Sequence, residues 1–172
     1  MAQTDILRIA GLVDESIVDG PGFRYAVFTQ GCTHNCPGCH NPHTHDPNGG
    51  REIVIDEIVD NIKKNPLLDG ITLTGGDPFL QADPCALLAQ KIKQLGLTVV
   101  TYTGYTLEEL LKRPDFMPLL EQTDILIDGP FQIEKRSLDL LYKGSLNQRI
   151  IDVPASLKAG KTVEWTEPDF SS

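Results

Sequence analysis

Short apolar segments alternate with helical patterns along most of this chain. Five segments have the composition of strands: residues 24–30, 71–74, 97–101, 125–127 and 150–153. Short strands that are apolar along their whole length indicate a sheet covered on both faces, and their alternation with helices predicts βαβ units with a parallel sheet. The first four are each followed by a polar or glycine-rich stretch. Because the carboxyl ends of parallel strands share one edge of a sheet, we expect these stretches to form a single site.

The segments between the strands carry the spacing and the end signals of helices. Apolar side chains recur at helical intervals in residues 55–62. Asp83 is the expected N-cap of a second helix, with Pro84 at its first position and Gly96 at its end. Residues 106–109 form a capping box, which predicts the start of a short third helix.

The chain length limits the size of the fold. A length of 172 residues predicts one domain over residues 1–172, and the 40% apolar content suffices for a continuous core. A complete eight-stranded barrel of this alternating type needs roughly 200 residues or more. We therefore expect an α/β fold with a partial, open (β/α) barrel, whose open side can admit a large partner.

Charge and hydropathy exclude several classes of function. The net charge of −9 gives no electrostatic attraction to phosphate backbones, so nucleic-acid binding is not expected. No apolar run reaches the roughly 18 residues that span a membrane. The first residues have neither the basic nor the apolar region of a secretion signal, so a cytoplasmic location is expected, where thiols stay reduced.

Three of the four cysteines lie within eight residues, in the spacing CxxxCxxC: Cys32, Cys36 and Cys39. A structural zinc site usually takes four ligands. Three thiolates on a four-iron cluster leave the fourth iron open to a substrate or cofactor, whereas electron-transfer clusters are fully ligated by cysteine. Gly31 and Gly38 permit the tight turns that bring three thiolates together. The spacing therefore favours a reactive iron–sulfur cluster.

Spacing alone leaves other interpretations of the cysteines open. One is a zinc site completed by a histidine, from His34, His40, His43 or His45. Another is a group of buried thiols without metal. Cys85 lies in a helical pattern 46 residues after Cys39. It is expected to be a small buried hydrophobe, with a fourth-ligand or redox role as the alternative.

The stretch Gly75-Gly76-Asp77-Pro78 follows the strand at residues 71–74. Two glycines expose backbone groups to close approach by a ligand. By itself this stretch is also ordinary turn chemistry. Its combination with the cysteine motif favours the ligand-binding interpretation.

Together these motifs resemble those of radical S-adenosylmethionine (SAM) proteins of the glycyl-radical-enzyme activating branch, in particular activating proteins of anaerobic ribonucleoside-triphosphate reductases. The matching stretches are residues 19–24, 32–41, 74–78, 102–109, 125–131 and 144–149. CxxxCxxC with Gly-Gly-Asp-Pro is specific for the superfamily, and the later stretches select the family. Many radical SAM proteins have an aromatic residue before the third cysteine; Gly38 there is the form usual in this family.

The resemblance implies a barrel of the radical SAM type that holds a [4Fe-4S] cluster and SAM. One electron from the reduced cluster would cleave SAM to methionine and a 5′-deoxyadenosyl radical, which takes a hydrogen atom from a glycine of the partner. The implied partners are the large subunit of anaerobic ribonucleotide reductase, through its glycyl-radical loop, and an electron donor such as a flavodoxin-type reductant. The cofactor performs this chemistry, so no general acid or base is required.

The resemblance also implies roles for residues near the cluster. Cys32, Cys36 and Cys39 would be its ligands. Gly38 and His40 flank the third ligand and would touch the adenine side of SAM.

Residues that follow the later strands have further implied roles. At the stretch from Thr74 to Asp77, the backbone of Gly75 and Gly76 would receive the methionyl amino group, and Asp77 would shape the turn. Thr103 and Asp128 would bind the ribose, the carboxylate or a monovalent cation, or else cap strand ends. Asn147 and Arg149 would contact the partner or belong to a surface loop.

Two alternative functions remain open at this point. One is another radical SAM enzyme, either the activase of a different glycyl-radical enzyme or a deazaguanine synthase. The other is a binding module that holds zinc or a cluster without catalysis. Metal analysis after anaerobic purification separates the second from the first.

Overall fold

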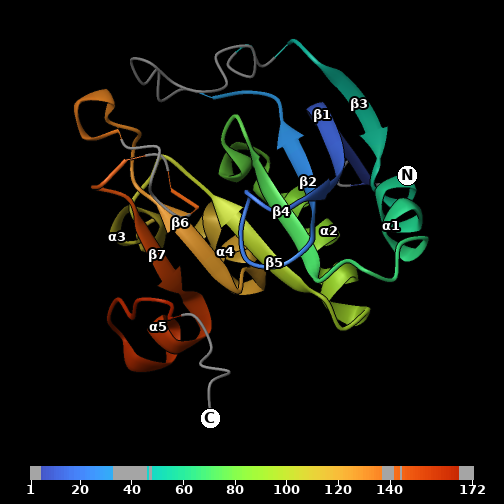
Figure 1. Cartoon of the computed structure of the whole chain (residues 1–172). Coiled ribbons are helices and arrows are strands. Elements are labelled where there is room, and N and C mark those ends of the chain that lie inside the picture. The colour runs from blue at the N-terminus through green and yellow to red at the C-terminus, as the bar shows by residue number, and fades with distance from the viewer. Residues whose placement is uncertain (1–4, 33–45, 47, 137–141, 144, 167–172) are drawn as a thin grey trace.

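The computed structural model describes residues 5–32, 46, 48–136, 142–143 and 145–166. They form a mixed sheet of seven strands, in the order β3-β1-β2-β4-β5-β6-β7 (Figure 1). The strands are β1 (Ile6–Ser16), β2 (Arg24–Thr29), β3 (Arg51–Val54), β4 (Gly70–Gly75), β5 (Thr98–Tyr102), β6 (Ile125–Asp128) and β7 (Arg149–Asp152). The α-helices are α1 (Ile55–Lys63), α2 (Ala82–Gln94), α3 (Leu107–Leu111), α4 (Met117–Gln122) and α5 (Val153–Ala159).

The four central strands, β2, β4, β5 and β6, run parallel to one another, as the alternating pattern predicts. The outer strands are antiparallel to their neighbours: β1 to β2, β3 to β1, and β7 to β6. The described sheet ends at β3 on one side and at β7 on the other, so it is not closed. The expected α/β class with an open sheet is confirmed, with antiparallel edges in addition to the parallel centre.

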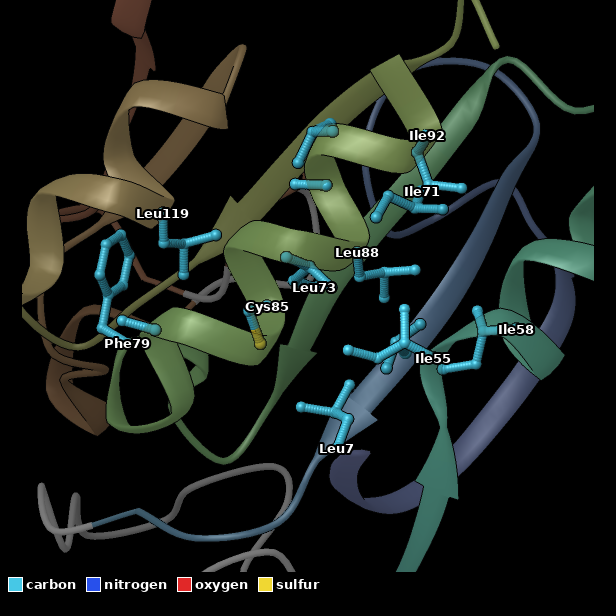
Figure 2. Packing of buried hydrophobic residues seen from close by; sticks show 14 of the residues in the cluster. Leu7, Ile55, Ile58, Ile71, Leu73, Phe79, Cys85, Leu88, Ile92 and Leu119 are labelled. Atoms are coloured by element: carbon cyan, nitrogen blue, oxygen red, sulfur yellow. The ribbon is translucent and has the colours of Figure 1, made fainter. Parts of the chain in front are cut away.

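Helices cover one face of the sheet and bury a continuous apolar core. Figure 2 shows Ile55 and Ile58 of α1, Leu88 and Ile92 of α2, and Ile71 of β4 packed in this core. Each of these side chains is at most 1% exposed. Full burial of such a side chain contributes roughly 1.5–3 kcal/mol, so this face holds the helices to the sheet. The helical pattern predicted in residues 55–62 is confirmed as α1.

The expected N-cap of the second helix is wrong. A 3₁₀ turn, Pro78–Gln81, leads directly into α2, which begins at Ala82 and has Asp83 in its first turn. The side chain of Asp77 caps this turn by accepting a hydrogen bond from the Phe79 N–H. The capping box at residues 106–109 is confirmed at the start of α3.

The connection between β1 and β2 lies across the face of the sheet opposite the helices (Figure 1). The hydroxyl of Thr72, in β4, donates to the carbonyl of Asp19 at 2.5 Å. At Gly20 a Cβ atom would lie 3.2 Å from the side chain of Val100, in β5. Asp19 and Gly20 of this connection therefore lie against the face of the sheet opposite the helices.

None of the helices that the structure describes has the length and apolarity needed to cross a membrane.

Candidate active site

The carboxyl ends of the parallel strands carry the residues that the sequence singles out. Cys32 follows β2, Gly76 and Asp77 follow β4, Thr103 follows β5, and Asp128 ends β6. These four strands are consecutive in the sheet and parallel, so their ends lie at one edge. The predicted convergence is confirmed for these residues. Cys36, Gly38, Cys39 and His40 lie outside the described residues.

The glycine turn after β4 packs directly on the backbone that leads into Cys32. The N–H of Gly76 donates to the Thr29 carbonyl, and the N–H of Asp77 donates to the Gly31 carbonyl, both at 2.8 Å. A Cβ atom on Gly76 would lie 2.3 Å from the Gly31 oxygen, and one on Gly75 would lie 2.6 Å from the Thr29 nitrogen. Only glycine fits these two positions, because real Cβ atoms do not approach backbone so closely.

This packing limits how the turn can hold a ligand. The N–H groups of Gly76 and Asp77 are used within the protein. An ammonium group is a hydrogen-bond donor and needs acceptors. A ligand amino group at this turn would need backbone carbonyl oxygens as acceptors, and the expected contact of Gly75 and Gly76 with SAM stays a prediction.

The carboxylate of Asp77 joins the end of β4 to the end of β5. Asp77 is 1% exposed. The hydroxyl of Thr103 donates to its Oδ2 at 2.9 Å, and the N–H of Gly104 donates to the same oxygen at 3.0 Å. The Thr103 hydroxyl also accepts from the N–H of Tyr105 at 3.1 Å. Thr103 is thus part of the frame of the site, and its suggested contact with SAM or a cation stays a prediction.

Asp128 lies in an ion pair with Arg149. The carboxylate of Asp128 is 1% exposed and accepts from Arg149 Nε at 3.1 Å. It also accepts from the N–H of Leu107 at 2.8 Å, at the first residue of α3. Arg149 reaches Glu108 as well, with Nη2 to Oε2 at 2.7 Å, and this guanidinium lowers the pKa of Glu108 to about 2. The described contacts favour the capping role for Asp128.

The stretch that precedes Arg149 holds the loop after β6. The side-chain amide of Asn147 donates to the carbonyl of Pro130 at 2.7 Å, and that of Gln148 donates to the carbonyl of Gly129 at 3.0 Å. The sequence analysis identified residues 125–131 and residues 144–149 as family-like stretches, but it did not predict that they contact each other. That both belong to the family-like stretches was the only feature of the sequence that could have suggested this contact.

Cys85 lies in the apolar core, away from solvent. It lies in α2, is 0% exposed, and packs within the cluster that includes Leu88 and Phe79 (Figure 2). Burial, with a smaller effect from Asp77, raises the pKa of its thiol well above the usual range. The thiol stays protonated at neutral pH, so the interpretation of Cys85 as a buried hydrophobe is confirmed.

The position of Cys32, the described cysteine of the motif, is compatible with a role as a cluster ligand at the edge of the site. Cys32 is half-buried, directly after β2, and borders the glycine turn. In the described ranges no group of three or more His, Cys, Asp or Glu side chains is arranged to hold a metal ion. Two of the three expected ligands, Cys36 and Cys39, fall outside those ranges.

Comparison with known proteins identifies the family of this chain. Residues 18–151 match the family model described as a 4Fe-4S single cluster domain. The anaerobic ribonucleoside-triphosphate reductase-activating protein of Escherichia coli K12 is 36% identical over 140 residues, which cover 77% of this chain and 90% of that protein. The pyruvate formate-lyase-activating enzyme of Clostridium pasteurianum is 35% identical over 131 residues, covering 71% of this chain and 55% of that enzyme.

Among solved structures, the crystal structure of QueE from Escherichia coli is a remote likeness. It has a TM-score of 0.44 and 16% identity, and the match covers 59% of this chain and 53% of QueE. The sequence relatives and the family model instead identify the protein: the chain belongs to the 4Fe-4S family of anaerobic ribonucleoside-triphosphate reductase-activating proteins.

Proposed function

We propose that this protein generates a glycyl radical on an anaerobic ribonucleoside-triphosphate reductase by reductive cleavage of SAM. One observation carries the proposal: the Gly75-Gly76 turn is packed against Gly31, the residue before Cys32. This contact supports a site in which a ligand held by the turn lies beside the first cysteine of the cluster motif. The activity itself is that for which the relatives are named.

The chain's own residues hold and orient the cofactors. Cys32, Cys36 and Cys39 would ligate a [4Fe-4S] cluster, which supplies, when bound, the electron that breaks the sulfonium bond of SAM. The carbonyl groups of Gly75 and Gly76 would hold the amino group. Gly38 and His40 would lie toward the adenine side.

A monovalent cation would bind at the end of β6. At Asp128 it would compete with the guanidinium of Arg149 for the same carboxylate. Titration of potassium against SAM affinity decides the point: a potassium-dependent affinity that disappears in Asp128→Asn would place the cation there.

The partner enters from the open side of the sheet. The large subunit of the reductase would insert its glycyl-radical loop there, because an unclosed sheet leaves room for a protein segment. A flavodoxin-type protein would supply the electron. We place the activity in the cytoplasm, where thiols stay reduced before the cluster assembles.

The test uses the reconstituted protein under anaerobic conditions. The reduced protein, SAM and the reductase are expected to give a glycine-centred doublet in electron paramagnetic resonance (EPR). A reductase deuterated at the glycine α-carbon is expected to pass deuterium into 5′-deoxyadenosine. Variants of Cys32, Cys36 or Cys39 to Ala are expected to lose the cluster, while the matched variant Cys85→Ala retains it.

Because a pyruvate formate-lyase-activating enzyme is also a relative, the same experiment is repeated with pyruvate formate-lyase as the acceptor protein. If the doublet forms on pyruvate formate-lyase and not on the reductase, the partner assignment is wrong. SAM cleavage without deuterium transfer from either protein would move the function to another radical SAM class. Zinc in place of oxygen-sensitive iron would contradict the enzyme assignment altogether.

A further inference from the structure

Two short stems flank the part of the chain that carries the cysteine motif. The outgoing stem, residues 30–32, directly follows β2, and the returning stem, residues 46, 48 and 49, precedes β3. The returning stem is a turn, because the N–H of Gly49 donates to the carbonyl of Asp46 at 3.0 Å. Residues 33–45, between the stems, lie outside the described part of the chain.

The side chain of Gln30 joins the two stems. Its Nε2 donates to the carbonyl of Asp46 at 2.7 Å. A Cβ atom on Gly49 would lie only 2.6 Å from the same nitrogen, so the returning stem packs directly on this amide. Gln30 is 4% exposed, and a buried amide that loses water is stabilised by the hydrogen bonds that replace it.

The outgoing stem is itself fixed to the frame of the sheet. The N–H of Gln30 donates to the carbonyl of Arg8, in β1, at 3.1 Å. The carbonyl of Gln30 accepts from Gln81 Nε2 at 3.0 Å, and Gln81 Oε1 accepts from the N–H of Arg8 at 2.9 Å. Gln81 belongs to the 3₁₀ turn before α2. The position of Gln30 is therefore set by β1, β2 and this turn together.

The side chain of Arg8 holds the returning stem to the same frame. Its Nη1 donates to the carbonyl of Gly49 at 2.8 Å, and its Nη2 lies 3.1 Å from Glu52 Oε1, in β3. The Arg8 side chain is 31% exposed, whereas Gln30 is buried between the stems. Arg8 therefore supports the contact from outside, and Gln30 makes the direct link.

We infer that Gln30 is a positioning residue for the iron–sulfur cluster, which it serves by joining the stems on either side of the cysteine motif. This inference rests on the proposed function, since it assigns the cluster to Cys32, Cys36 and Cys39. A cluster whose three ligands come from one segment can bind only if that segment is ordered, and ordering costs conformational entropy. Joined stems lower this cost before the cluster binds, so the cluster is held more tightly.

Two substitutions of Gln30 remove the link in different ways. Gln30→Met keeps the length of the side chain but has no donor for the carbonyl of Asp46. Gln30→Glu keeps the shape but places an oxygen against that carbonyl, which replaces an attraction by a repulsion. Both variants are expected to weaken the retention of the cluster, and Gln30→Glu the more strongly.

Gln148 is a matched control at the same edge of the sheet. Its Nε2 donates to the carbonyl of Gly129 at 3.0 Å, so it also ties a backbone carbonyl with a side-chain amide. The loop that it holds follows β6 and does not carry the cysteine motif. Gln148→Met is therefore expected to lower stability without loosening the cluster.

The experiment compares the wild-type protein with Gln30→Met, Gln30→Glu, Arg8→Ala and Gln148→Met after anaerobic reconstitution. The measurements are iron per chain, the rate at which a chelator removes iron, and the EPR spectrum of the reduced cluster, all below the melting temperature of every variant. We expect both Gln30 variants to release iron roughly fivefold faster or more, with an altered EPR spectrum. Arg8→Ala should change the rate in the same direction but less, and Gln148→Met by less than about twofold.

Hydrogen exchange gives a second measurement that needs no metal. The N–H of Gly49 donates to the carbonyl of Asp46 that Gln30 holds, so its exchange in the iron-free protein reports on the joined stems. We expect Gln30→Met to lower the protection of this amide by roughly fivefold or more, and Gln148→Met to leave it unchanged. Equal protection in Gln30→Met and wild type would overturn the inference, because the stems would then not depend on Gln30.

The outcomes remain separable from the proposed function. Wild-type protein that takes up no iron would end the proposed function, and this inference with it. Wild-type protein that holds the cluster, with iron release from Gln30→Met at the same rate, would overturn the inference alone. An acceleration in Gln148→Met as large as in Gln30→Met would also overturn it, because the effect would then be general instability. If Gln30→Glu does not fold, Gln30→Met decides by the same measurements.

Discussion

Arg24 begins β2 and buries a guanidinium group that is only 1% exposed. Its hydrogen bonds go to neutral oxygen atoms of Thr72, Pro21, Thr98 and Ile71. Burial lowers its pKa to about 10, so the side chain remains charged at neutral pH. The five bonds compensate the loss of water and join the β1–β2 connection to the starts of β4 and β5.

We predict that Arg24→Lys strongly destabilises the apo-protein. Lysine carries three donors on one nitrogen and cannot reproduce the planar set of five. The expected loss is about 2–4 kcal/mol in the free energy of unfolding, measured by urea denaturation. Arg51→Lys, at an exposed position in β3, should change this free energy by less than about 0.5 kcal/mol. Equal stability of the two variants would contradict the role assigned to Arg24.

Gly76 allows a second prediction at the level of single residues. A methyl group there would lie 2.3 Å from the Gly31 oxygen, so Gly76→Ala must move the turn away from the cysteine segment. We expect SAM affinity to fall by roughly tenfold or more, since the ligand carbonyls move with the turn. Gly11→Ala is the control, because a Cβ atom there meets nothing within 4 Å. Normal SAM binding by Gly76→Ala would show that the turn does not hold SAM.

Helix α3 is tied to β6 and β7 through its first turn. Its Thr106 capping box closes on Glu109, Asp128 accepts from the N–H of Leu107, and Arg149 bridges Asp128 and Glu108. These contacts fix the short helix, whose five residues are too few for a stable helix without tertiary contacts. The end of β6 is thereby tied to the helix that follows β5 and to β7, the strands on either side of it.

This network predicts an acid dependence of stability. Hydrogen bonding to Arg149 lowers the pKa of Glu108 from 4.5 to about 2. The ionised carboxylate is therefore favoured in the folded state, and its stabilisation is complete above about pH 4.5 and lost as the pH falls toward 2. Because the Glu108 side chain is 55% exposed, we expect a contribution below roughly 1 kcal/mol.

The measurement is the urea midpoint at pH 6 and at pH 3. Wild-type stability should fall more between these values than that of Glu108→Gln, which lacks the titrating group. Glu121→Gln, on the exposed side of α4, should behave like wild type. The same acid dependence in Glu108→Gln and wild type would rule out the ion pair as its source.

At the scale of the whole molecule, the apolar core and Cys32, the described cysteine of the motif, are separate. The larger core cluster lies between the helices and the sheet, while Cys32 is at the carboxyl edge of β2. Stability of the described sheet thus comes chiefly from burial that involves no metal. In small zinc domains, by contrast, metal binding supplies the folding free energy.

We predict that the protein without iron remains folded. Removal of the cluster by an anaerobic chelator should leave the far-ultraviolet circular dichroism spectrum essentially unchanged, with a cooperative thermal transition. Cys32→Ala, prepared without reconstitution, should give the same spectrum. Loss of the sheet signal on removal of iron would mean that the metal organises the fold, as in the non-catalytic binding-module alternative.

Local patterns in the sequence predicted the elements that depend on neighbours along the chain. The apolar runs predicted the parallel strands, because a strand buried on both faces is apolar along its whole length. The capping box at Thr106 predicted the start of α3, because its hydrogen bonds close within three residues. The sequence analysis did not predict β1. Apolar and polar side chains alternate only partly in residues 6–16, and this strand is stabilised by pairing with both β2 and β3. The extent of the single domain over residues 1–172 stays a prediction.

The sequence by itself determined the family and the edge of the sheet at which the described motif residues meet. Only the tertiary structure decided what the polar residues at that edge contact. Asp77 reaches Thr103 across 26 residues, and Asp128 reaches Arg149 across 21. Such pairs depend on the order and direction of strands, because two side chains distant in sequence meet only when their strands lie side by side. For the same reason Asp77, and not Asp83, caps the turn before α2.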